Sequence, residues 1–475
     1  MAQAVQTAPI ALTQEEYRRD WEPRGWQLLI IGPTASWRQE WGEWEAIRDI
    51  VQNALDESEG YYWEFDRQGL WIGDQGKGVQ VADFLLGPLR LKPPYARGRF
   101  GEGMKIATLA LLRQGYPVYV RTVGRELYMV FLRQMVDGEA DTLAALWRMG
   151  GTRTGTHFHI LGYFGSAFED RFAVNILERD ILHQGPSPLA EPIPRYNQLI
   201  ASPPGRLYAR DIYMRDIDSP WSYVLWGFEM APDRHAPKSE QDMWVDMGRL
   251  WATVTDVSLL ERFLGMVREP PEEETIESHF VNMDPWSMGD EPVSEKRYAD
   301  LVAEQGHAWR EAWRRKFGDN AVIRTTERWD GTVRHLGYEP VGVFWSVRDT
   351  LALAIHTDAA LVQESQERLR EVQAVPDSRL TPRQRPHLGL ARKIVERLLF
   401  TPVPVHAAMI PPASDRMRTA GLYSRSLREI YIATDQLERA RSAVDTMIQM
   451  IDTQCQHPPH LVRAGPCGPP WIHLA

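Results

Sequence analysis

The chain has 475 residues, of which 43% are hydrophobic and 25% are charged, and its formal net charge is −10. The composition is ordinary for a globular protein, and the length suggests two or three domains with a large core. The negative charge argues against a broad nucleic-acid-binding surface, although it leaves room for a local basic patch.

Targeting and redox signals are few. Two cysteines exclude a disulfide scaffold and suit a reducing compartment. The first residues lack the basic start and apolar stretch of a signal peptide, and no apolar run approaches the ~20 residues of a membrane span. We therefore expect a cytoplasmic protein with no membrane partner.

The first informative element is a helix predicted from Trp37 to Glu57, with Ser36 as its N-terminal cap. A buried stripe at helical spacing consists of Trp41, Trp44, Ile47, Val51, Ala54 and Leu55. A polar row on another face consists of Glu45, Asp49, Asn53 and Asp56. The side-chain oxygen of Asn53 is a hard ligand of the kind that Mg²⁺ prefers.

A glycine-rich turn follows a predicted hairpin, whose strands are Tyr62–Phe65 and Leu70–Ile72. The turn consists of Asp74, Gln75, Gly76, Lys77 and Gly78. Glycines let the backbone pass close to a ligand, and a carboxylate at the floor of a pocket can accept a hydrogen bond from an adenine amino group. Taken alone, this string would be an ordinary turn.

A second glycine-rich segment leads into a predicted apolar helix at Ile106–Leu112. Its candidate ligand contacts are Arg99, Phe100, Gly101, Glu102, Gly103 and Lys105. Glycines at a helix N-terminus expose amides at the positive end of the helix dipole, which favours anions. Lys77 and Arg97 are further candidate phosphate contacts, and residues 79–97 would form a lid.

The last motif is Gly155-Thr156, which opens a predicted strand at His157–Leu161. His157 and His159 are interpreted as sheet residues rather than metal ligands. All four motifs in this order, within one domain's length, are hard to obtain by chance.

Together these motifs resemble the ATP-binding fold of the GHKL superfamily, which includes DNA gyrases, heat-shock chaperones of the Hsp90 kind, histidine kinases and MutL. The sequence of the second glycine-rich segment looks most like that of the MutL, MORC and topoisomerase VI members of this superfamily. The resemblance implies an α/β (α+β) domain with helices on a mixed sheet, and it implies ATP and Mg²⁺ as ligands. The resemblance implies that Asp74 and Thr156, the latter within the Gly155-Thr156 motif, hold adenine, that Asn53 holds the metal, and that the glycine loop with Lys105 holds phosphates.

The sequence departs from the family pattern at Asp49. The family acid that orients and deprotonates the attacking water is normally Glu, and Asp is one methylene shorter. Because proton transfer depends on hydrogen-bond reach, hydrolysis could be slow, could use Glu45 instead, or could be absent while binding survives.

Changes in composition along the chain predict its domains and linkers. We expect the ATP-binding domain at residues 1–183 and a transducer-like α/β region at 184–267, which begins with a Pro-rich linker from Gln184 to Pro204. An acidic linker is expected at 268–294. Arg234 or Lys238 could sense the γ-phosphate. A C-terminal α/β domain at 295–475 faintly resembles small zinc peptidases without their H-E-x-x-H motif.

A tail cluster of Cys and His could in principle bind zinc, but it matches no usual finger spacing. It consists of Cys455, His457, His460, Cys467 and His473.

The sequence predicts an Mg-dependent ATPase in which ATP drives lid closure and domain rearrangement. One alternative is a non-hydrolysing nucleotide-gated scaffold or switch, and another is a DNA-processing ATPase of the MutL or topoisomerase kind. A histidine kinase is disfavoured because no dimerisation helices with a phospho-acceptor His precede the ATP site. A chaperone or an immune-type ATPase stays open, as does a nucleotide-dependent homodimer, and the protein client is unknown.

Overall fold

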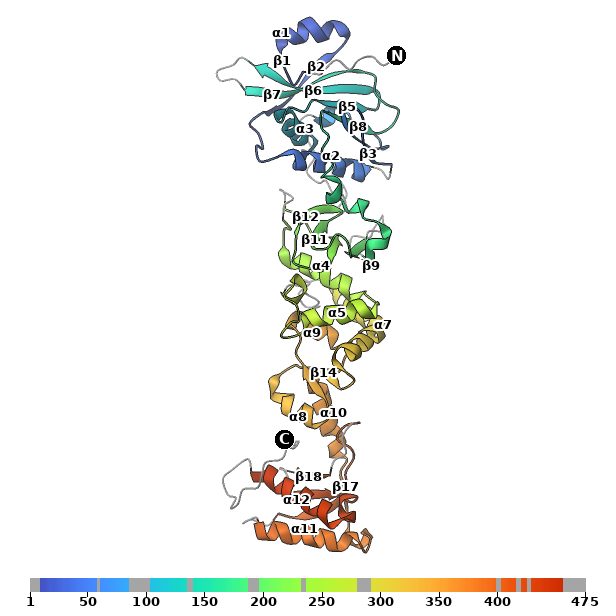
Figure 1. Ribbon diagram of the computed structural model, residues 1–475, viewed down its shortest axis with the longest axis vertical. Helices are drawn as coiled ribbons and strands as arrows, with labels where there is room; N and C mark the ends of the chain where they lie inside the picture. Colours follow the sequence, from blue (N-terminus) through green and yellow to red (C-terminus); the bar gives the residue numbers. More distant parts are fainter. Residues whose placement is uncertain are drawn as a thin grey trace. The chain divides into compact units, whose positions relative to one another are not determined.

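The protein has a mixed α/β structure, seen in a computed structural model (Figure 1). The structure describes residues 9–57, 60–84, 103–134, 140–186, 196–231, 236–279, 292–398, 403–415, 420–424 and 429–455. The chain forms two compact units, Met1–Met243 and Trp244–Ala475. Among the described helices, none combines the length and apolar character needed to cross a membrane.

The first unit contains an eight-stranded sheet with the order β2-β7-β6-β5-β8-β4-β3, in which β1 pairs in parallel with β6. Its strands are β1 (Ala11–Thr13), β2 (Gln27–Thr34), β3 (Tyr62–Phe65), β4 (Gly69–Gly73), β5 (Val118–Thr122), β6 (Arg125–Gln134), β7 (Ala140–Met149) and β8 (Thr156–Leu161). The predicted hairpin is confirmed as β3 and β4, and the predicted last strand is confirmed as β8.

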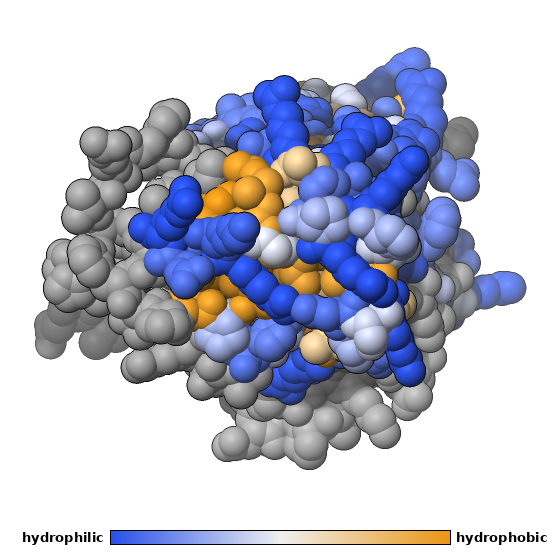
Figure 2. Space-filling model, turned by 90° about the horizontal axis from the view of Figure 1, so that it is seen from below, coloured by the Kyte–Doolittle hydropathy of each residue, from blue (hydrophilic) through white to orange (hydrophobic). Residues whose placement is uncertain are grey.

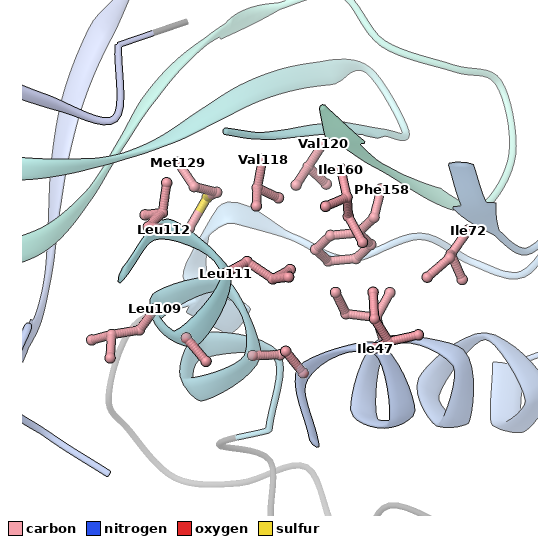
Figure 3. Close-up of a cluster of buried hydrophobic side chains, with 14 of the residues drawn as sticks. Ile47, Ile72, Leu109, Leu111, Leu112, Val118, Val120, Met129, Phe158 and Ile160 are labelled. Carbon is pink, nitrogen blue, oxygen red and sulfur yellow. The ribbon is translucent and has the colours of Figure 1, made fainter. Parts of the chain in front are cut away.

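Two helices, α2 (Glu43–Glu57) and α3 (Gly103–Arg113), cover one face of this sheet and confirm the two predicted helices apart from their boundaries. Figure 3 shows Ile47 of α2 and three leucines of α3 against apolar side chains of β4, β5, β6 and β8. Side chains of β6 alternate between the two faces of the sheet. Leu127 and Met129 belong to the cluster that contains the helices, whereas Val130 and Leu132 belong to a second cluster.

The second cluster lies on the other face of the sheet and packs against the N-terminal segment. That segment contains the short helix α1 (Gln14–Glu16), which Thr13 caps at its N-terminus. Trp21 and Trp26 pack edge to face with ring centroids 5.7 Å apart. The sheet is therefore covered on both faces at its β6–β7 centre.

The prediction that α2 begins at Trp37, with Ser36 as its cap, is wrong. The helix begins at Glu43, and residues 35–40 form turns. The guanidinium of Arg113 explains the difference, because it donates hydrogen bonds of 2.9–3.3 Å to the carbonyl oxygens of Ala35, Trp37, Arg38 and Trp41. Carbonyls that bond to Arg113 fix this loop in a non-helical shape.

A second sheet in the same unit has the order β12-β11-β13-β10-β9. Its strands are β9 (Ile181–Pro186), β10 (Tyr196–Ile200), β11 (Arg206–Ala209), β12 (Ile212–Asp216) and β13 (Ser222–Leu225). The strands β9 and β10 occupy part of the segment predicted as a Pro-rich linker, and the other three lie in the predicted α/β region. The segment that follows β8 contacts this second sheet, since the backbone N–H of Ala173 donates to the carbonyl oxygen of Asp211, in the turn between β11 and β12, at 2.8 Å.

The second unit begins with a helical part. It contains α5 (Val257–Val267), α6 (Ile276–His279) and α7 (Pro292–Phe317), after α4 (Glu240–Ala252), which spans the boundary between the units. The helix α6 and the start of α7 lie within the predicted acidic linker, and residues 280–291 lie outside the described part. Trp251 stacks on Phe263 with ring centroids 4.3 Å apart.

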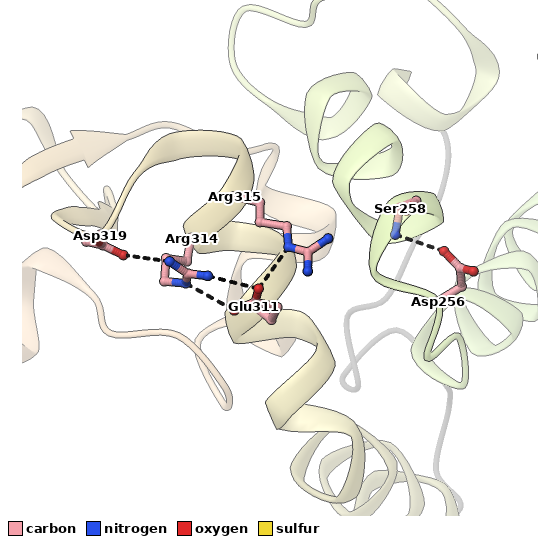
Figure 4. A network of polar contacts seen from close by, with 6 residues as sticks. All are labelled: Asp256, Ser258, Glu311, Arg314, Arg315 and Asp319. Atoms are coloured by element: carbon pink, nitrogen blue, oxygen red, sulfur yellow. Dashed lines mark hydrogen bonds and ion pairs between the residues drawn. The ribbon is translucent and has the colours of Figure 1, made fainter.

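Polar contacts define the ends of these helices (Figure 4). Asp256 caps α5 by accepting from Ser258 N at 2.8 Å. In α7, Glu311 accepts hydrogen bonds from Arg314 and Arg315, which lower its pKa to about 2.

The chain then forms a small α/β region and a C-terminal four-stranded sheet of order β16-β17-β19-β18. The small region contains β14 (Ala321–Ile323), α8 (Asp330–His335), β15 (Glu339–Val341), α9 (Trp345–Leu351) and α10 (Asp358–Arg370). The C-terminal part contains β16 (Gln373–Val375), α11 (Gln384–Leu398), β17 (Val405–Met409), β18 (Gly421–Ser424), β19 (Glu429–Ala433) and α12 (Ala440–Cys455).

Both helices of the C-terminal part, α11 and α12, contribute buried residues to one core with β17 and β19. Some apolar side chains are left at the surface, among them Leu390 of α11 and Met409 of β17. Figure 2 shows hydrophobic residues between strongly hydrophilic ones on the face of the molecule that it views.

The Arg113 contacts lead to a stability prediction. Arg113→Ala should lower the free energy of unfolding by about 2 kcal/mol, since hydrogen bonds from one charged group to four carbonyls are lost. Trypsin should also cut faster after Arg38, where the loop loses its anchor. The matched control is Arg67→Ala, an exposed arginine in the β3–β4 turn. The free energy of unfolding of both variants is measured by urea denaturation. Equal values for Arg113→Ala and Arg67→Ala would contradict the role of Arg113.

Candidate functional site

The acid and the amide of the first motif lie one turn apart on α2. Asp49 is only 1% exposed, and Asn53 is half-buried. The Nδ2 of Asn53 donates to the carbonyl oxygen of Asp49 at 2.7 Å and lies 3.5 Å from Asp49 Oδ2. The Asn53 side chain also carries an amide oxygen, which is a ligand of the kind that Mg²⁺ accepts.

Glu45, the second candidate acid, has a different position. Its Oε2 accepts from the backbone N–H of Gly42 at 2.9 Å, which closes the N-terminus of α2. This carboxylate is engaged in capping, so the structure gives it a local role that the sequence prediction missed. Asp56 lies in the last turn of α2 and is half-buried.

Helix α3 meets α2 at the carboxylate of Asp49. A Cβ atom placed on Gly103, the first residue of α3, would lie 1.5 Å from Asp49 Oδ2. The absence of a side chain at Gly103 therefore permits this approach. Lys105, in the first turn of α3, is also buried at 3% exposure. An acid, an amide, a lysine and a helix N-terminus are thus collected between α2 and α3.

The Asp74 turn forms a second group of motif residues. Asp74 is 4% exposed, and its Oδ1 accepts from Gly76 N at 2.7 Å. Burial raises the pKa of Asp74, and the nearby Glu57 adds to this effect, whereas the hydrogen bond from Gly76 opposes it. Buried acids with a raised pKa are more frequent at functional sites than elsewhere.

Gly155 joins the fourth motif to the Asp74 turn. Its φ is +69°, a left-handed conformation that favours glycine, and an added Cβ would lie 1.7 Å from the carbonyl oxygen of Asp74. Its backbone N–H donates to Gly76 O at 2.8 Å. A glycine at this position is therefore required by both backbone conformation and space.

The Thr156 hydroxyl fixes the end of the same turn. Thr156 is 5% exposed, and its Oγ1 accepts from Val79 N at 3.0 Å. Thr122 of β5 donates to Val79 O at 2.9 Å. Sequence reasoning missed Thr122; the signal was a threonine at an inward position of β5, where Val118 and Val120 are both buried.

Helix α2 connects the two groups. A Cβ added to Gly76 would lie 3.0 Å from Glu57 Cβ, so the C-terminal turn of α2 contacts the Asp74 turn. Asp49, Asn53 and Glu57 are separated by four residues each, which spans about 12 Å along a helix axis. The structure therefore brings together Asp49, Asn53, Gly103, Lys105, Asp74, Gly76, Gly78, Gly155 and Thr156 along one helix.

Several predicted residues are not brought into this group. Lys77 is exposed. Lys238 donates to Glu229 Oε2 at 3.0 Å. Arg97, Arg99, Phe100, Gly101, Glu102 and Arg234 lie outside the described residues, as does the lid beyond Val81–Phe84.

Over the part of the chain that the structure describes, no group of three or more His, Cys, Asp or Glu residues is placed to hold a metal ion. Cys455 ends α12, and the other residues of the proposed zinc tail lie beyond the described part. An Mg²⁺ ion that takes one protein ligand and otherwise phosphates and water does not need such a cluster.

Comparison with known proteins adds nothing to this geometry. No model of a known protein family matches the chain, and no curated protein is significantly similar to it.

The raised pKa of Asp74 leads to a pH-dependent prediction. The ionised form of Asp74 is less favourable in the folded chain than in the unfolded chain. The contribution of Asp74 to stability is therefore fully present below pH 3.8, the usual pKa of an aspartate, and should fall as the pH rises through the raised pKa of the folded state. Asp74→Asn keeps an acceptor for Gly76 and removes this effect. Urea denaturation at several pH values should show Asp74→Asn gaining stability relative to wild type as the pH rises.

Asp66→Asn is the matched control with the opposite sign. Burial alone would raise the pKa of Asp66, but hydrogen bonds from Trp71 and Gln68 lower it. Wild type should therefore gain stability over Asp66→Asn as the pH rises. The same sign for both variants would contradict the environment described for Asp74.

Proposed function

We propose that residues 1–183 form a GHKL-type ATP-binding domain, and that the protein is an Mg-dependent ATPase in which ATP drives lid closure and domain rearrangement. The observation that carries the proposal is the meeting of distant motifs along α2: Asp49 against Gly103 in the middle of the helix, and Asp74 near Glu57 and against Gly155 at its C-terminal end. A nucleotide is an elongated ligand with different chemistry at its two ends, so it suits two separate polar groups on one helix.

The Asp74 turn suits the adenine end. A nearly buried carboxylate can accept a hydrogen bond from the adenine amino group, and guanine offers a carbonyl oxygen at that position instead. The glycines at 76, 78 and 155 bring backbone close to the turn, and Thr156 with Thr122 fixes its position. Discrimination of this kind is strong, because a mismatched base leaves a buried polar group unpaired.

The residues where α2 meets α3 suit the phosphate end. The N-terminus of α3 and the lysine at 105 favour anions. The amide oxygen of Asn53 would hold Mg²⁺, which would supply positive charge to neutralise the charge that develops during phosphoryl transfer. Asp49 would accept a proton from the water that attacks the γ-phosphate, and ADP and phosphate would leave.

A second candidate function is a nucleotide-gated scaffold that binds ATP without hydrolysing it. The 1% exposure of Asp49 favours it, because a base that water cannot reach does not act. The GHKL-type adenine and phosphate contacts would be the same in both cases, so turnover separates the two functions.

The proposal is tested by measuring ATP binding and Mg-dependent hydrolysis on the same samples. Asp49→Asn should lower turnover by about 100-fold or more while ATP still binds, because it removes only the base. Asn53→Ala should weaken Mg·ATP binding, with little effect on nucleotide binding in EDTA. Glu64→Gln, an exposed acid on β3, is the control and should match wild type.

Two other outcomes have defined meanings. Binding without turnover in every sample would favour the scaffold. Absence of ATP binding by the wild-type chain would contradict the proposed function.

A further inference from the structure

The contact between Gly103 and Asp49 is unusually close. A Cβ atom on Gly103 would lie 1.5 Å from Asp49 Oδ2, 2.4 Å from its Cγ and 2.9 Å from its Oδ1. Real Cβ atoms do not approach other atoms to such distances, so alanine at 103 requires the carboxylate or α3 to move. The whole carboxyl group of Asp49 therefore occupies the space in which a side chain at 103 would lie.

The same carboxylate has little freedom to move. Asp49 is 1% exposed, and Asn53 Nδ2 lies 3.5 Å from the Oδ2 atom that faces Gly103. The neighbouring helix residues Ile50 and Val51 are buried in the core with Ile47, which holds the helix backbone in place. Displacement of the carboxylate thus has to come from a change of rotamer or from separation of α2 and α3.

From this geometry we infer that Gly103 is a positioning residue that fixes the carboxylate of Asp49, and that the two residues are matched in size. The close approach of α3 brings its N-terminus up to the shorter acid, and this compensates for the missing methylene. A glutamate at 49 would extend into the space that α3 occupies. The catalytic part of this inference rests on the proposed ATPase function.

The expected effect of Asp49→Glu on turnover is opposite to the effect that the family pattern implies. If Asp49 were a weakened version of the family acid, Asp49→Glu would restore faster hydrolysis. If Asp49 and Gly103 are matched, Asp49→Glu lowers the turnover number by about 100-fold, the effect of misplacing a catalytic group by about 1 Å. The KM and the dissociation constant for ATP should change little, because the nucleotide contacts remain.

Stability measurements test the contact without any nucleotide. Gly103→Ala should lower the unfolding temperature by about 5 °C or more, because it overfills a packed space. The loss should be much smaller when Asp49→Ala is already present, since the colliding carboxylate is then gone. Gly389→Ala is the matched control: it also lies within a helix, but its Cβ would meet nothing within 4 Å, so no loss is expected.

The experiment combines both readouts on wild type, Asp49→Glu, Gly103→Ala, Asp49→Ala and the double variant. Two results together support the inference. The loss of unfolding temperature caused by Gly103→Ala is much smaller in the presence of Asp49→Ala, and Asp49→Glu loses turnover but still binds ATP. Turnover by Asp49→Glu that equals or exceeds wild type overturns it, as does additive behaviour of the double variant. A wild-type chain that binds no ATP overturns the proposed function and the catalytic role of Gly103 with it, whereas the coupling still reports the contact.

Discussion

The packing of α2 against the first sheet is the constraint on which the rest of the site depends. The apolar side of this helix, with Ile47 and Val51, is fully buried, so the helix cannot rotate or slide without opening the core. Its polar side chains are consequently held at fixed positions. Asp49 is placed against α3, and the last turn is placed against Asp74.

Close backbone approach has the same function at two places along α2. In the middle of the helix Gly103 admits the carboxylate of Asp49, and beside its C-terminal end Gly155 admits the carbonyl oxygen of Asp74. A glycine makes no side-chain contacts and loses more conformational freedom on folding than other residues, but it lets the backbone come close to a neighbouring group. Two acids are thereby buried in well-defined surroundings, which is costly for stability and is typical of functional sites.

Periodicity predicted the elements that carry these residues, but it did not predict their exact ends. The apolar runs of α3 and the alternation in β3, β4 and β8 were sufficient, because each of these elements packs one face on the core. The start of α2 was missed because it is decided by Arg113, a residue far along the chain that binds the carbonyls of residues 35–41. Local signals such as Ser36 cannot report such a contact.

Two further features were out of reach of sequence reasoning. The strand β9, with Pro186 at its end, was read as part of a linker; it is an edge strand, where proline is tolerated. The contact of Asp49 with Gly103 joins two elements that are distant in sequence, so the pattern placed both residues at one site but not against each other.

The central claim is that the middle and the C-terminal end of α2 belong to one nucleotide site, and a crystal structure with Mg²⁺ and a non-hydrolysable ATP analogue tests it most directly. The account predicts the adenine amino group at the carboxylate of Asp74, the metal at the amide oxygen of Asn53, and the phosphates at the N-terminus of α3. A nucleotide bound elsewhere, or one whose base lies away from Asp74, would contradict the account.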